Sequence, residues 1–138
     1  MPSVPSELIF TAGLAHLLVL LAAAMVPFKL DWRGALGPLP PLHRQMYVVY
    51  GGYIILSIVA FAVISIVHAP QLAGGDGLAR AVCLYMAVFW GVRLGLQWVL
   101  AVKPYLTSTL DRLGYHALTM VFVFLTLTYT WAALGPSP

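Results

Sequence analysis

Charged residues are scarce in this chain. Only 8% of its 138 residues are charged, and four of them are acidic. A soluble domain carries about 25% charged residues, which keep its surface hydrated. Because 62% of the residues are hydrophobic and the mean hydropathy is +0.94, the apolar surface must face lipid or another subunit. The composition therefore excludes a soluble globular protein.

Several kinds of chemistry also lack their residues. The single cysteine, Cys83, cannot form an internal disulfide, and we expect it to be a small packing residue. The sequence has no phosphate-binding loop, nucleophile elbow, zinc-protease motif or pair of carboxylates. The seven Lys and Arg residues form no basic run, so nucleic acid is not an expected partner. The sequence thus indicates no catalytic residue and no metal ligand set, and an enzyme is not the expected class.

Four long apolar runs are present instead. A helix needs about 20 apolar residues to cross the hydrocarbon core of a bilayer. Four ranges meet this requirement: Leu8–Val26, Met46–Val67, Ala79–Val102 and Tyr115–Leu134. Short links place successive spans in opposite directions. The sequence predicts an all-α membrane protein, with residues 1–138 forming one domain of four transmembrane helices in an antiparallel up-down bundle.

The links between the spans contain the turn-forming residues. Residues 27–41 and 69–77 are rich in Pro and Gly, and we expect them not to be helical. Ser108 and Asp111 form a capping-box pattern that can open the fourth helix.

The basic residues predict an orientation. Cytoplasmic loops carry an excess of Lys and Arg. The links after the first and third spans contain five such residues, whereas the opposite side has only Arg80. The five are Lys29, Arg33, Arg44, Lys103 and Arg112. This asymmetry predicts that these two links are cytoplasmic and that both termini lie on the non-cytoplasmic side.

Polar residues inside the spans are the main functional signal, because lipid penalises them. Arg93 and Gln97 share one face of the third span, and no Asp or Glu within the four ranges could pair with Arg93. Tyr50 and Tyr53 lie in the second span and His116 in the fourth, at depths within the same leaflet. We expect these polar faces to converge inside the bundle. The pattern predicts a ligand-binding site of Arg93, Gln97, Tyr50, Tyr53 and His116 for the head group of an amphiphile such as a lipid or quinone.

Other interpretations remain open at this point. The four histidines, His16, His68, His43 and His116, give one pair per leaflet, which would suit b-type haem and electron transfer. A purely structural subunit is a further alternative, in which a partner supplies the carboxylate for Arg93. The expected partners are the lipid bilayer together with a membrane enzyme or further copies of the chain. The first span lacks the glutamate that small multidrug transporters require, and the sequence alone assigns no family.

Overall fold

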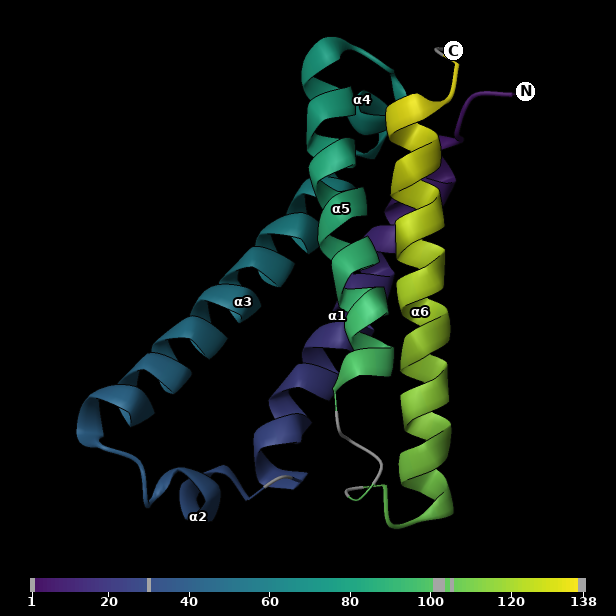
Figure 1. Cartoon of the computed structure of the whole chain (residues 1–138). Helices are drawn as coiled ribbons and strands as arrows, with labels where there is room; N and C mark the ends of the chain where they lie inside the picture. Colours follow the sequence, from purple (N-terminus) through teal and green to yellow (C-terminus); the bar gives the residue numbers. More distant parts are fainter. Residues whose placement is uncertain (1, 30, 101–103, 105, 137–138) are drawn as a thin grey trace.

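The computed structural model describes residues 2–29, 31–100, 104 and 106–136, and most of these residues lie in α-helices (Figure 1). In chain order the helices are α1 (Ser6–Lys29), α2 (Trp32–Leu36), α3 (Pro41–Val67), α4 (Ala69–Ala73), α5 (Gly77–Val99) and α6 (Thr109–Leu134). Four of them, α1, α3, α5 and α6, are long and apolar enough to cross a membrane. The prediction of a four-helix integral membrane protein is therefore confirmed.

The observed ends of three long helices differ from the predicted ends of the spans. The Ser108 hydroxyl accepts a hydrogen bond from the Asp111 backbone N–H, so α6 begins at Thr109, six residues before the predicted start. Pro41 occupies the first turn of α3, where its missing N–H costs nothing, and α3 begins five residues early. Leu100 has extended backbone and ends α5, whereas the predicted span ran to Val102, which lies outside the described residues.

The expectation that the first two links lack helix is wrong in part. Pro27 stays inside the last turns of α1, and the short helix α2 follows within the first link. The second link contains α4, with Pro70 in its first turn. Proline is compatible with the first turn of a helix, so a proline-rich link can still contain short helices.

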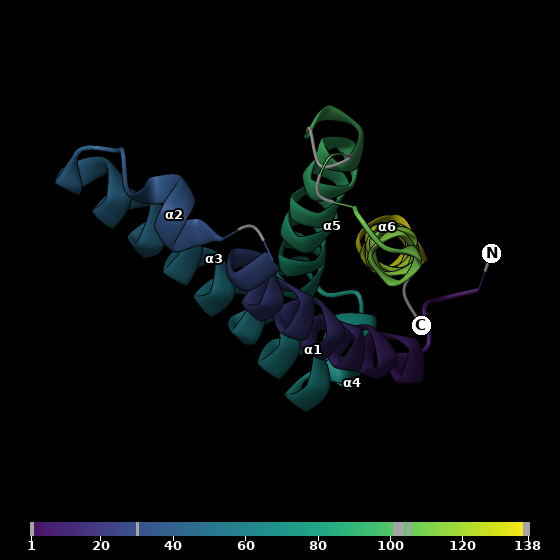
Figure 2. The same cartoon turned by 90° about the horizontal axis from the view of Figure 1, so that it is seen from below.

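The long helices pack as two pairs rather than as an evenly closed bundle. α1 packs along α3 and α5 packs along α6, while α1 also contacts α6 (Figures 1 and 2). α3 diverges from α5 toward the α2 end of the molecule. Accordingly, residues 41–57 of α3 include no buried side chain, and its buried residues are Ile58, Phe61, Ala62 and Ser65.

Gly13 sets the close approach of α1 to α3. A Cβ atom at this position would lie 2.7 Å from Cγ1 of Ile66, 3.0 Å from Cβ of Ser65 and 3.1 Å from the Ile66 backbone nitrogen. Small residues allow membrane helices to approach in this way. Two glycines of the third span, Gly91 and Gly95, behave differently, because a Cβ on Gly91 would only touch Thr126 and one on Gly95 would meet open space.

The two ends of the molecule differ in character. Both termini and α4 lie at one end (Figure 1), where Arg80 donates hydrogen bonds to the carbonyls of Gly75 and Ala133. The opposite end, here called the basic end, contains α2 and the first turns of α3 and α6, with Arg33, Arg44 and Arg112.

Candidate functional site

Arg93 lies on α5, six residues before the last residue of the helix and therefore about 9 Å from its basic end. Its side chain is partly buried. The Nη1 atom donates a hydrogen bond to Oε1 of Gln97 at 3.1 Å, and the guanidinium carbon lies 4.9 Å from the centre of the Phe122 ring. Among the described residues, no carboxylate forms an ion pair or hydrogen bond with Arg93. The charge is thus held by a neutral amide and an aromatic face.

A directional chain of hydrogen bonds continues from Arg93 to α6. Gln97 accepts through Oε1, so its Nε2 is the donor, and it donates to Oγ1 of Thr119 at 2.6 Å. Thr119 donates in turn to the Tyr115 carbonyl at 3.0 Å, and the Tyr115 hydroxyl donates to the Gln97 carbonyl. This chain, here called the Arg93 relay, joins α5 to α6, and each of its acceptors is uncharged.

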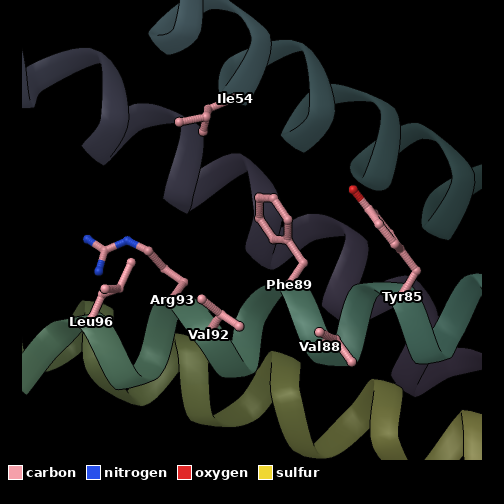
Figure 3. A pocket seen from close by; sticks show the side chains of 7 residues that line it. All are labelled: Ile54, Tyr85, Val88, Phe89, Val92, Arg93 and Leu96. Carbon is pink, nitrogen blue, oxygen red and sulfur yellow. The ribbon is translucent and has the colours of Figure 1, made fainter. Parts of the chain in front are cut away.

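An apolar groove lies beside Arg93, where α3 diverges from α5. It has a volume of about 510 Å³ and is lined by Ile54 of α3 and by Tyr85, Val88, Phe89, Val92, Arg93 and Leu96 of α5. In Figure 3, Tyr85, Phe89 and Arg93 project from one side of α5, as their spacing of four residues requires. The guanidinium is the charged group in a wall that is otherwise almost entirely apolar.

The structure brings together only part of the predicted site. Arg93 and Gln97 form a hydrogen bond on α5. Gln97 also donates to Thr119 of α6, so the polar faces of α5 and α6 meet as expected. Tyr50 and Tyr53 are 57% and 63% exposed on the diverging half of α3 and do not reach the Arg93 relay. His116 is also exposed, with its ring centre 5.5 Å from that of Tyr115. The polar face of α3 therefore does not join the other two in this conformation.

His16 occupies a second polar cluster, which the sequence did not predict. Its side chain is fully buried, and its Nδ1 lies 2.8 Å from the Ala12 carbonyl oxygen. Nε1 of Trp90 donates to Nε2 of His16 at 3.0 Å. An indole N–H only donates and a carbonyl only accepts, so the imidazole is neutral with its proton on Nδ1. The rings of Phe61 and Tyr129 pack edge-on against it.

These contacts bear on the haem hypothesis. Both ring nitrogens of His16 are engaged inside the protein, so neither is free to bind iron. His68 is exposed between α3 and α4, and His43 and His116 are exposed on α3 and α6, which are well separated at the basic end (Figures 1 and 2). Within the described part of the chain, no group of three or more His, Cys, Asp or Glu residues could hold a metal ion. The geometry gives no support to a histidine-ligated cofactor.

The remaining buried polar groups stabilise the core. The hydroxyls of Ser65 and Tyr129 form a hydrogen bond between α3 and α6. Cys83 is fully buried on α5, as expected of a packing residue. No buried side-chain nitrogen or oxygen in the described residues lacks a partner. Sequence patterns could not reveal the Ser65–Tyr129 and His16–Trp90 pairs, because their members lie 64 and 74 residues apart.

Comparison with known proteins gives no relative for this arrangement. No family model matches the chain, no curated protein matches its sequence, and no solved structure matches its fold. What the fold itself establishes is a small polytopic membrane protein with four apolar helices long enough to span a bilayer.

Proposed function

We propose that this protein binds an amphiphile, with the head group on Arg93 and the tail in the groove between α3 and α5. The observation that carries the proposal is a cationic side chain within a membrane helix that has no carboxylate partner among the described residues. It stands in the wall of an apolar groove. A charged group and an apolar channel side by side match the two halves of a lipid-like molecule.

The position of Arg93 has an energetic cost that a ligand would offset. Insertion scales assign about 2.5 to 3.5 kcal/mol to arginine at the centre of a membrane helix. A guanidinium has five N–H donors, and the described residues accept a hydrogen bond from only one of them. The Arg93 side chain extends along α5 toward Leu96 and the basic end (Figure 3), and its guanidinium reaches Gln97 one turn further along the helix. The side chain thus points toward the nearer end of α5, yet it remains partly buried against the Phe122 ring.

The groove suits the tail of such a ligand. Small-molecule sites commonly enclose about 300 to 1,000 Å³ and are lined mainly by apolar and aromatic side chains. The groove has about 510 Å³ with five aliphatic or aromatic residues on α5 and Ile54 opposite. Since α3 and α5 are both membrane helices, a ligand can enter laterally from the bilayer.

The other predicted residues keep a place in the proposal. Gln97 holds the Arg93 guanidinium through its amide oxygen. Tyr50 is one turn before Ile54 on the same stripe of α3, where its hydroxyl would reach a head group at the mouth of the groove. Tyr53 and His116 would contact a larger head group from the flanks. The apolar surface around residues 41–57 of α3 leaves room for a helix of a membrane-enzyme partner or a second copy, and we propose an accessory role.

A matched pair of arginine variants tests the proposal. Arg93→Gln removes the intramembrane charge, whereas Arg112→Gln removes an exposed charge at the basic end. Native mass spectrometry of the purified proteins should show an amphiphile on the wild type and on Arg112→Gln, but not on Arg93→Gln. An equal complement of lipids on all three proteins would refute a binding role for Arg93.

A further inference from the structure

The Arg93 relay and the aromatic end of the groove define the class of ligand more closely. We infer that the ligand is a single-tailed anionic amphiphile, with a carboxylate or phosphate head on Arg93 and a tail that ends against Phe61. This inference rests on the proposed binding function and deepens it. It selects an anion over a neutral carbonyl head and assigns a role in tail selection to Phe61.

The direction of the relay argues for an anionic head. Gln97 can offer Arg93 only its amide oxygen, because the guanidinium donates and the amide nitrogen cannot accept. Phe122 offers a ring face. Neither carries a charge, and a charge removed from water is stable only when an opposite charge accompanies it. A quinone carbonyl would leave the positive charge uncompensated, whereas a carboxylate or phosphate accepts two parallel N–H bonds and neutralises it.

At the end of the groove remote from the basic end, Phe61 packs behind two of the lining side chains, Phe89 and Tyr85. Its ring packs edge-on against Phe89, with centres 5.1 Å apart, and against Tyr85, with centres 5.8 Å apart. From this contact toward the basic end, α3 diverges from α5 and the groove lies between them. Arg93 is eight residues from Tyr85 along α5. Eight helical residues span about 12 Å, which limits the length of tail that fits between the head and the aromatic end.

The width of the groove argues for one tail. Its walls come from two helices, and its volume of about 510 Å³ lies in the lower half of the range of small-molecule sites, about 300 to 1,000 Å³. The second tail of a diacyl lipid would have to remain in the bilayer. A fatty acid or an alkyl phosphate satisfies both the charge and the shape.

The first experiment separates head groups at a constant tail. Wild-type protein in phosphatidylcholine nanodiscs is titrated with decanoate, decyl phosphate, decanol and decyl-ubiquinone, and binding is measured by native mass spectrometry. Each anion should bind at least about tenfold more tightly than decanol, as expected for one charge-assisted pair. The difference should vanish in Arg93→Gln and persist in Arg112→Gln. Equal binding of decanol, or preferential binding of the quinone, would overturn the anionic assignment while leaving amphiphile binding intact.

The second experiment tests the aromatic end with saturated fatty acids from octanoate to stearate. Phe61→Ala should move the preferred length to longer acids, and the milder Phe61→Leu should move it less. Phe10→Ala, at an exposed position of α1 away from the groove, should leave the profile unchanged. Phe61→Leu keeps the test valid if the alanine variant fails to fold. An unmoved profile with binding that still depends on Arg93 would refute the role of Phe61 alone, whereas no binding of any probe would refute the proposed function as well.

Discussion

The hydrogen bond between Trp90 and His16 provides a quantitative test of the core. Trp90 is almost completely buried, and its indole N–H reaches Nε2 of the fully buried His16 at 3.0 Å. Trp90→Phe keeps an aromatic ring against Phe122 but removes the donor, which leaves Nε2 without a partner. An unsatisfied buried acceptor costs about 1 to 3 kcal/mol, and the lost ring atoms add a packing cost.

A double-mutant cycle isolates the hydrogen bond from the packing cost. The cycle compares wild type, Trp90→Phe, His16→Leu and the double variant. Hydrogen bonds between membrane helices average about 0.6 kcal/mol in such cycles, with a maximum near 1.7 kcal/mol. We expect a coupling energy in the upper half of that range, because both groups are buried and each lacks another described partner for the atoms involved.

The assay is reversible unfolding in mixed micelles, with the free energy obtained from the denaturing-detergent dependence of the circular dichroism signal. Both single variants should be less stable than wild type, and the double variant should be less destabilised than the sum. A coupling below about 0.3 kcal/mol, which is within the usual error of additivity, would show that the indole–imidazole bond does not stabilise the fold.

Three further outcomes follow from the structure. Gly13→Leu should destabilise the protein by at least about 2 kcal/mol, because the new side chain meets α3. Gly51→Leu should be nearly neutral, since nothing lies within 4 Å of a Cβ added at Gly51. Equal unfolding midpoints of the two variants would contradict the close approach of α1 to α3 at Gly13. Tyr129→Phe should lower the free energy of unfolding by about 1 to 3 kcal/mol, because it leaves the Ser65 hydroxyl unpaired. The double variant Ser65→Ala/Tyr129→Phe should lose less stability than the sum of the two single variants, as unfolding of all three proteins will measure. The excess of basic residues at the basic end predicts that the C-terminus is non-cytoplasmic. Alkaline phosphatase fused to the C-terminus should therefore be active, and green fluorescent protein fused there should not fluoresce. The reverse pattern would refute the predicted orientation.

Apolar runs were enough to predict the four spans, because bilayer thickness fixes the length of a crossing helix. The capping pattern at Ser108 also predicted a real helix start, since the cap depends on residues three apart. Both signals are local. What the sequence could not show was the divergence of α3, because the apolar run of residues 46–67 would look the same whether lipid or a neighbouring helix covers it.

The candidate site was predictable where its members share one helix. Arg93 and Gln97 are four residues apart on α5, and their hydrogen bond follows from helical geometry. Tyr50 and Tyr53 lie at a similar depth but on a helix that turns away, so depth alone did not determine proximity. From the sequence, His16 was considered only as a haem ligand in the electron-transfer alternative. Its partner, Trp90, is 74 residues away, and only the packing of α1 against the α5–α6 pair reveals it.

The arrangement of the helices as two pairs has a consequence for how the protein is made. Each pair consists of helices that are consecutive long segments of the chain, α1 with α3 and α5 with α6. Each can therefore enter the bilayer as a hairpin during synthesis, with its own contacts formed as soon as its second helix is inserted. The first hairpin contains His16 with only its own backbone as a partner until Trp90 arrives on α5. Docking of the second hairpin then completes the polar core and forms the groove beside Arg93.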